Sequence, residues 1–251
     1  MDETKIKDFA ALIRNSRSTV FFGGAGVSTE SGVKDYRSED GLYNTVRQYG
    51  VPPEEILSHT FFERRPDVFY DFYYTYFLQS QAKPNPAHLA LADLERRGLL
   101  DAVITQNIDG LHQAAGSVNV LELHGTTFAY HCSRCGKEFP MESVKALAGK
   151  IPVCEKCGGI IRPDVVLYEE ALNEGVVSRA VQAIADAELL IIGGTSLAVY
   201  PAAGYIRYFG GDHIVLINRD ETPYDGIAEL IFRDKIGEVM TAVMKRIDAD
   251  L

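Results

Sequence analysis

Four cysteines form two closely spaced pairs near the middle of the chain. Two residues separate Cys132 from Cys135 and also Cys154 from Cys157, and a glycine follows each pair. Two such pairs, 18 residues apart, supply the four thiolates of a tetrahedral zinc site and leave no coordination position for a substrate. We therefore predict one structural zinc ion, which holds together a segment too short to build its own core. A redox dithiol is the alternative, but it does not need two pairs.

A glycine-rich turn follows the first apolar segment. Residues 18–22 are uncharged and rich in β-branched and aromatic side chains, which predicts a short buried strand. Gly24 and Gly26 come next, and glycines let a ligand approach the backbone closely. A helix that begins near Ser28 would point free N–H groups at a phosphate in this turn. The turn alone also fits ordinary packing in an α/β protein, because Thr29 stands where the dinucleotide fingerprint has its third glycine.

Polar residues also follow predicted strands further along the chain. Residues 106–110 follow a strand over 101–105, and His124 follows one over 120–123. Ligands of open α/β sheets bind beyond the carboxyl ends of strands, so these side chains are candidates for a site. Asn and Asp also cap helices, and a lone histidine is more often structural than catalytic. The place of His124 at a strand end, before a glycine, makes a catalytic role as well supported as a structural one.

Helical and strand patterns alternate along most of the chain. Apolar spacing and caps predict helices over residues 5–16, 85–97, 174–186 and 234–248, and further strands over 189–192 and 213–217. Residues 193–196 form a second phosphate- or ribose-type loop, and residues 161–168 are predicted to return to the main sheet. This order predicts an α/β fold with a doubly wound parallel sheet.

Two segments differ from that alternation. Residues 38–80 contain a proline pair followed by dense aromatic residues, which predicts a small helical module. Residues 128–160 contain the cysteine pairs. We expect these two segments to form a small domain, and residues 1–37, 81–127 and 161–251 to form the nucleotide-binding domain.

Composition limits the functional classes. The chain has 251 residues, 46% of them hydrophobic, and a net charge of −10 without any basic run. Nucleic-acid binding is therefore not expected, because it relies on clustered Lys and Arg. The acidic N-terminus does not match a signal peptide, and the apolar runs are too short to span a bilayer. Paired cysteines fit a reducing compartment, so we expect a soluble cytoplasmic protein.

Together these motifs resemble one family, the sirtuins, which are NAD-dependent protein-lysine deacylases. The resemblance rests on residues 24–28 with Asp35 and Arg37, on 105–112, on His124 with Gly125, on the four cysteines, on 194–197 and on Asn218. It spans nearly the whole chain in the family's order. It implies a Rossmann-like sheet with a small inserted zinc-ribbon and helical module.

The resemblance implies that NAD is the co-substrate and that the motif residues bind it. The implied contacts are Gly24, Ala25, Gly26, Ser28, Asp35, Tyr36, Arg37, Gln106, Asn107, Ile108, Asp109, His124, Gly194, Thr195, Ser196, Asn218, Asp234 and Lys235. Residues 106–109 with Asp35 would surround the nicotinamide and inner ribose, and Thr195, Ser196 and Asn218 would face the adenosine half. Asp234 and Lys235 would lie near the adenine.

The implied catalytic residues are His124, Asn107 and Asp109. The acetyl oxygen of the substrate attacks C1′ of the ribose, nicotinamide leaves, and His124 deprotonates the ribose hydroxyl system. Fixed polar groups suit the positive sugar that develops, and a base with a pKa near neutral suits the proton transfer.

The implied partner is an acetyl-lysine segment of a protein, bound by a monomeric enzyme. It would lie as an added strand between residues 165–168 and 197–201. The implied contacts are Val165, Val166, Leu167, Tyr168 and Val199, with Val165 lining the acyl channel. Sirtuins that remove acidic acyl groups carry Tyr-x-x-Arg, whereas this chain has Tyr73 and Tyr76. We therefore expect acetyl to be preferred over succinyl.

Three positions depart from the family's pattern. Lys34 replaces a proline, Tyr36 replaces a phenylalanine, and Glu169 replaces the glycine of Phe-Gly-Glu. These departures bear on substrate choice and rate, because no proton-transfer or cofactor residue is lost. A mono-ADP-ribosyltransferase with the same pocket and a non-catalytic zinc-ribbon and nucleotide-binding module are the competing hypotheses. A dehydrogenase fits less well, because a separate substrate domain is lacking.

Overall fold

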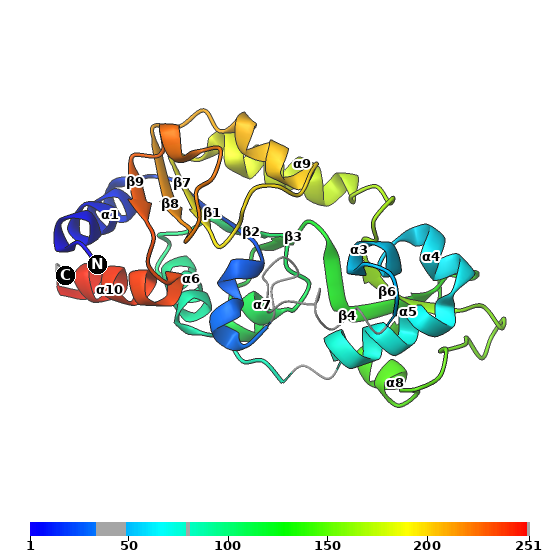
Figure 1. Cartoon of the computed structure of the whole chain (residues 1–251). Coiled ribbons are helices and arrows are strands. Elements are labelled where there is room, and N and C mark those ends of the chain that lie inside the picture. Colours follow the sequence, from blue (N-terminus) through cyan, green and yellow to red (C-terminus); the bar gives the residue numbers. More distant parts are fainter. Residues whose placement is uncertain (34–48, 79–80, 250–251) are drawn as a thin grey trace.

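Two β-sheets organise the chain in this computed structural model, which describes residues 1–33, 49–78 and 81–249. The larger sheet has six strands in the order β3-β2-β1-β7-β8-β9, and all of its neighbouring strands are parallel. The smaller sheet has the order β5-β4-β6 and is antiparallel. Figure 1 shows the two sheets toward opposite ends of the molecule, with both termini beside the larger one.

The larger sheet confirms the predicted parallel architecture. Its strands are β1 (Thr19–Gly23), β2 (Ala102–Thr105), β3 (Val120–Glu122), β7 (Leu189–Gly193), β8 (His213–Ile217) and β9 (Leu230–Phe232). Every residue of β1 and β7 is buried, as expected for central strands covered on both faces. Gly23 pairs with Thr105 on one side and Gly193 on the other, so β1, β2 and β7 end level and their loops meet. The sequence predicted these strands but missed β9.

Helices cover both faces of the larger sheet. One face carries α1 (Glu3–Asn15), α6 (Pro86–Arg96) and α10 (Ile236–Ala249), whose apolar residues share a core with β1, β2, β7 and β8. The other face carries α9 (Glu174–Asp186) and the 3₁₀ segment η4 (Ala202–Tyr208). Figure 1 shows α9 on the opposite side of the strands from α6 and α10. This arrangement is the predicted doubly wound fold.

The smaller sheet packs against the aromatic helices. It contains β4 (Gly125–Cys132), β5 (Glu138–Pro140) and β6 (Ile161–Val165), with α8 (Met141–Lys145) after β5. The helices are α3 (Pro53–Ile56), α4 (His59–Arg64), α5 (Pro66–Tyr73) and the π-helical η3 (Tyr74–Leu78). Phe69, Tyr70 and Tyr73 are buried in one cluster with Tyr130 and Ile161 of this sheet. The aromatic residues therefore have the packing role expected of them.

Two local predictions were wrong. Residues 161–168 do not return to the larger sheet, because β6 pairs with β4 in the smaller sheet. No α-helix begins near Ser28; the chain makes two 3₁₀ turns, η1 (Ala25–Val27) and η2 (Thr29–Ser31), and Gly32 ends them with φ of 82°.

The division into two domains with the boundaries given above stays a prediction. Within the described ranges, no helix is both long and apolar enough to cross a membrane.

Candidate active site

The loops that follow β1 and β7 lie directly against each other. Gly24 N donates to Gly193 O at 3.3 Å, and Gly26 N donates to Gly194 O at 2.8 Å. A Cβ atom on Gly26 would lie 2.8 Å from Gly194 Cα, and one on Gly24 would lie 2.9 Å from Thr195 Cβ. The two predicted nucleotide loops therefore form one surface at the carboxyl edge of the sheet, and only glycine fits their contact.

Ser28, Asn107 and Asp109 form a hydrogen-bonded cluster beside these loops. Ser28 Oγ is buried and donates to Asp109 Oδ2 at 2.7 Å, and Asn107 Nδ2 donates to Ser28 Oγ at 3.1 Å. The other carboxylate oxygen of Asp109 accepts from Leu111 N at 3.0 Å. The structure thus brings together three residues that are up to 81 positions apart in the chain. Their polar atoms are held by one another before any ligand arrives.

His124 lies next to this cluster, between β3 and β4. Its Nδ1 is 2.9 Å from Gln106 O. A carbonyl oxygen only accepts hydrogen bonds, so Nδ1 carries the proton and the neutral ring has its lone pair on Nε2. The Gln106 side chain is held in turn, because its Nε2 donates to Thr195 Oγ1 at 3.2 Å. The ring orientation and tautomer are therefore those of a general base that accepts a proton at Nε2.

A cavity of about 680 Å³ connects these groups. Its predicted lining residues are Gly24, Ala25, Ser28, Gln106, Asn107, Ile108, Asp109, His124, Val165, Val166, Leu167, Tyr168, Gly194, Thr195, Ser196 and Val199. Gly26 lies behind this lining, in contact with Gly194. Asp35, Tyr36 and Arg37, like the departures at Lys34 and Tyr36, lie outside the described residues. One cavity is thus shared by the nucleotide loops, by His124 and by residues 165–168, which we call the peptide edge.

Of the five residues predicted to lie toward the adenosine, Thr195 and Ser196 are part of this lining and the other three are not. Asn218 follows β8, and its Nδ2 donates to Asp220 O at 2.9 Å. Asp234 pairs with the N-terminal amine of Met1 at 3.8 Å, and Lys235 Nζ lies 3.8 Å from Glu238. They follow the carboxyl ends of β8 and β9, at the same edge of the sheet as the nucleotide loops. Their contact with a nucleotide stays a prediction.

The peptide edge, residues 165–168, makes main-chain hydrogen bonds to neighbouring segments. Val166 N donates to His124 O at 2.9 Å, which places this segment beside the histidine. Tyr168 N donates to Leu57 O, and Tyr168 O accepts from His59 N, both at 3.0 Å. The segment is therefore continuous with the smaller sheet on one side and with the start of α4 on the other.

Glu169 and Glu170 hold this edge by different means. Glu169 has φ of 75°, a left-handed conformation that glycine adopts most readily. Its carboxylate accepts from Thr60 N at 2.9 Å and so caps the first turn of α4. Glu170 accepts two hydrogen bonds from Arg162, at 2.7 and 2.8 Å, and one from Leu167 N at 2.8 Å. Burial would raise the pKa of Glu170, but these hydrogen bonds outweigh it and lower the pKa to about 2.

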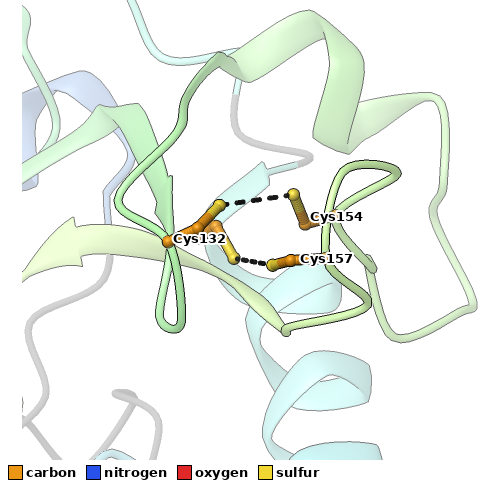
Figure 2. Close-up of side chains that lie close together, drawn as sticks. Cys132, Cys154 and Cys157 are labelled. Carbon is orange, nitrogen blue, oxygen red and sulfur yellow. Dashed lines mark hydrogen bonds between the residues drawn. The ribbon is translucent and has the colours of Figure 1, made fainter.

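The four cysteines meet between two loops of the smaller sheet. Their sulfur atoms all lie within 4.8 Å of one another, with Cys132 Sγ 3.4 Å from Cys157 Sγ and Cys135 Sγ 3.8 Å from Cys154 Sγ. Figure 2 shows Cys132 facing Cys154 and Cys157 across the gap between the loops. Zn–S bonds of about 2.3 Å in a tetrahedron separate the sulfur atoms by about 3.8 Å. The donor set and its spacing fit the predicted structural zinc.

Two groups near the cavity were not predicted from the sequence. His88 on α6 is fully buried, and its Nε2 lies 3.4 Å from Ser28 Oγ. Its only sequence signal is its place three residues after the cap Asn85, which is also what an ordinary capping residue would have. Lys145 of α8 lines the cavity from the smaller sheet's side. Nothing in the local sequence connects α8 with the nucleotide loops.

Comparison with known proteins agrees with this geometry. A family model described as the Sir2 family matches residues 24–201. A protein of Clostridium acetobutylicum named NAD-dependent protein deacetylase is 52% identical over 240 residues, covering 96% of this chain and 98% of that relative. One of the same name from Clostridium perfringens is 51% identical over 245 residues, covering 97% and 100%.

Solved Sir2 structures have the same fold. One Sir2 enzyme superposes with a TM-score of 0.90 at 37% identity, and the match covers 100% of both chains. A Sir2 protein solved with a p53 peptide and NAD⁺ has a TM-score of 0.86 at 40% identity, covering 97% of this chain and 99% of that chain. Another was solved with a deacetylated p53 peptide and 3′-O-acetyl-ADP-ribose, with a TM-score of 0.87 at 40% identity, covering 96% and 97%.

Proposed function

The chain belongs to the Sir2 family, and from that premise we propose that it is an NAD-dependent protein-lysine deacetylase with His124 as general base. The observation that carries this proposal is the hydrogen bond from His124 Nδ1 to Gln106 O, inside the cavity shared by the nucleotide loops and the peptide edge. This bond would hold the base beside both substrates. The deacetylase transfers acetyl from lysine to ADP-ribose and releases nicotinamide.

The residues present fit NAD. Gly24 and Gly26 contact residues 194 and 195 closely, and the cavity is lined there by glycine backbone and small side chains, which lets a diphosphate approach the chain. Ser28, Asn107 and Asp109 supply a fixed polar wall on the β2 side. NAD supplies the ribose carbon that accepts the acyl oxygen, with nicotinamide as the leaving group. We assign the nicotinamide end to that wall, because the charge that develops on the ribose is positive and Asp109 is acidic.

Residues of the chain then accept the proton, exclude water and hold the zinc ion. His124 accepts a proton at Nε2, while its Nδ1–H stays on the Gln106 carbonyl and holds the ring in place. Ile108, Val165 and Leu167 line the same cavity and exclude water around the acyl group. The zinc ion would be held by the four cysteines and would take no part in the chemistry, since no coordination position stays open.

The acetyl-lysine segment is proposed to bind along residues 165–168. These residues line the cavity beside Val199, as an added strand between the two segments requires. The backbone N–H and C=O of Tyr168 already bond to residues 57 and 59, so pairing at that residue would compete with existing bonds. Val166 N and Leu167 N are likewise bonded, to His124 O and to the Glu170 carboxylate, so an added strand would pair with the remaining main-chain groups of residues 165–168. The acidic composition supports a protein substrate and argues against nucleic acid.

The test is nicotinamide release from NAD with and without an acetyl-lysine peptide. The wild type should release nicotinamide with acetyl-ADP-ribose as co-product, and His124→Ala should slow that release by a factor of about 100 to 10,000. His213→Ala is the control, because His213 is a half-exposed histidine at the opposite end of the sheet. Transfer of label from NAD to protein without acetyl-ADP-ribose would instead support the ADP-ribosyltransferase. No release from folded, zinc-loaded protein would support the non-catalytic module.

The cytoplasmic location and the monomeric state belong to the same proposal. The reduced cysteine ligands that zinc needs support a reducing compartment. Sedimentation of the zinc-loaded protein should give the mass of one chain, 27.7 kDa. A dimer mass that persists on dilution would contradict the monomer.

A further inference from the structure

His88 lies behind the polar wall that Ser28, Asn107 and Asp109 form, and its Nε2 contacts that wall. The ring sits on α6, is fully buried and does not line the cavity. Its Nε2 is 3.4 Å from Ser28 Oγ, slightly beyond the usual N–H···O range of about 2.7–3.2 Å. Long contacts of this kind are common in sites without their ligands and tighten when the ligand binds.

The backbone of Asn85 fixes the tautomer of this ring. Asn85 N lies 3.3 Å from His88 Nδ1, within the capping box at the start of α6. A backbone N–H can only donate, so Nδ1 must accept and the ring proton must sit on Nε2. The side chain that points at Ser28 is therefore a donor.

Two donors then point at a single hydroxyl. Asn107 Nδ2 and His88 Nε2 both lie within reach of Ser28 Oγ, at 3.1 and 3.4 Å. A hydroxyl has one hydrogen, and here it is left to point at Asp109 Oδ2, 2.7 Å away. The Asp109 carboxylate is thus held by Ser28 at one oxygen and by Leu111 N at the other.

The surroundings of His88 keep its ring neutral. Burial lowers the pKa of His88, and the charge of Asp109 opposes that effect only in part. The His112 ring lies behind it with 4.8 Å between ring centroids, and burial together with His88 lowers the pKa of His112 to about 3. Neither ring nitrogen of His112 has a hydrogen-bond partner among the described residues, so His112 does not compete for the His88 proton.

We infer that His88 is a positioning residue: through its Nε2–H it fixes the direction of the Ser28 hydroxyl and thereby the orientation of Asp109 at the nicotinamide end of the cavity. The inference rests on the proposed function for its effect on turnover, but not for the hydrogen-bond geometry itself. His88 does not touch substrate or co-substrate. Its removal should therefore change the NAD-dependent step and leave peptide binding unaffected.

The decisive experiment compares two amide replacements at this position. The amide of His88→Gln can place an N–H near Nε2 and so keep the bond to Ser28. The shorter His88→Asn can accept from Asn85 N but cannot reach Ser28. Both are buried and polar, so their packing defects should be similar. We expect His88→Asn to lower kcat for nicotinamide release by about 10- to 100-fold, as misplaced catalytic groups do. His88→Gln should recover most of that loss, and KM for the acetylated peptide should stay unchanged in both.

A second measurement separates this inference from the proposed function. In ¹⁵N-histidine-labelled wild type without ligands, the His88 ring nitrogens should show a protonated Nε2 and an unprotonated Nδ1. The opposite tautomer, or equal kcat in the Gln and Asn variants with matched thermal stability, would overturn the inference. Absence of any nicotinamide release from wild type would overturn the proposed function instead, and the ring measurement would still decide the His88 contact.

Discussion

Replacing Gly26 by alanine should separate the two nucleotide loops. The added Cβ would lie 2.8 Å from both Gly194 Cα and Gly194 O. Carbon atoms pack best at about 3.5 Å, so the loops must move apart by roughly 0.7 Å. Both obstacles are backbone atoms and cannot rotate away. The movement also stretches the bond from Gly26 N to Gly194 O, now 2.8 Å.

The magnitude follows from the cost of overpacking. Inserting a methyl group into a well-packed contact destabilises a protein by about 1–3 kcal/mol. In a chain of 251 residues this corresponds to a fall in Tm of roughly 2–12 °C. NAD binding should weaken as well, because Gly24, Ala25 and Gly194 line the cavity on either side of the contact. If the bound state must restore the wild-type spacing, the loss of affinity reaches up to about 150-fold.

The assay is calorimetric titration of NAD into the zinc-loaded protein, with thermal unfolding of the same samples. Gly210→Ala is the matched control, because a Cβ there meets nothing within 4 Å and its φ is not positive. It should change the unfolding free energy by less than about 0.5 kcal/mol. If Gly26→Ala bound NAD within about twofold of the wild type and kept its Tm, the close approach of the loops would not be what forms the nucleotide site.

Three further predictions concern the zinc site, the peptide edge and the acyl group. Chelation, or Cys135→Ser, should remove one equivalent of zinc, measured by elemental analysis, and unfold the smaller sheet; retained Tm after metal loss would contradict the structural role. The lowered pKa of Glu170 gives stability that is present above its usual value of 4.5 and is lost as pH falls toward 2. The unfolding free energy of Glu170→Gln should therefore lie about 3 kcal/mol below wild type at pH 6 and approach it as the pH falls to 2. A constant difference across that range would refute this assignment. Acetyl peptide should be turned over faster than succinyl peptide, because acidic Asp109, Glu169 and Glu170 line the cavity; equal rates that fall with Lys145→Ala would show that Lys145 pairs with the acyl carboxylate.

Much of the larger sheet could be predicted from the sequence because its signals are local. The fully apolar run at residues 189–192 has the composition of a strand buried on both faces, and it forms the centre of the sheet beside β1. The cap at Asn85, with proline after it, marks the start of α6 correctly. The cysteine spacing likewise determines which residues meet, since four thiols at this spacing serve one metal.

The misplaced elements depend on partners that are distant in the chain. Residues 161–165 have a strand pattern, but that pattern does not say which sheet they join. They pair with residues of β4 from Gly125 to Cys132, and a Cβ on Gly125 would clash with Asp164 O. The turn near Ser28 fails to extend as a helix because Thr29 Oγ1 bonds back to Gly26 O and Gly32 is left-handed. His88 could not be connected with Ser28, 60 residues away, before the fold was known.

The position of His124 between β3 and β4 has a mechanical consequence. β3 belongs to the larger sheet and β4 to the smaller one, so the histidine sits where the chain passes from one sheet to the other. Were the smaller sheet to rotate against the larger, atoms near this crossing would shift least and atoms far from it most. The cavity wall at Phe77 and Met141 would move with the smaller sheet, while the bond from His124 to Gln106 would change little. In such a rotation the width of the cavity would change while the proton acceptor stayed close to the axis of rotation.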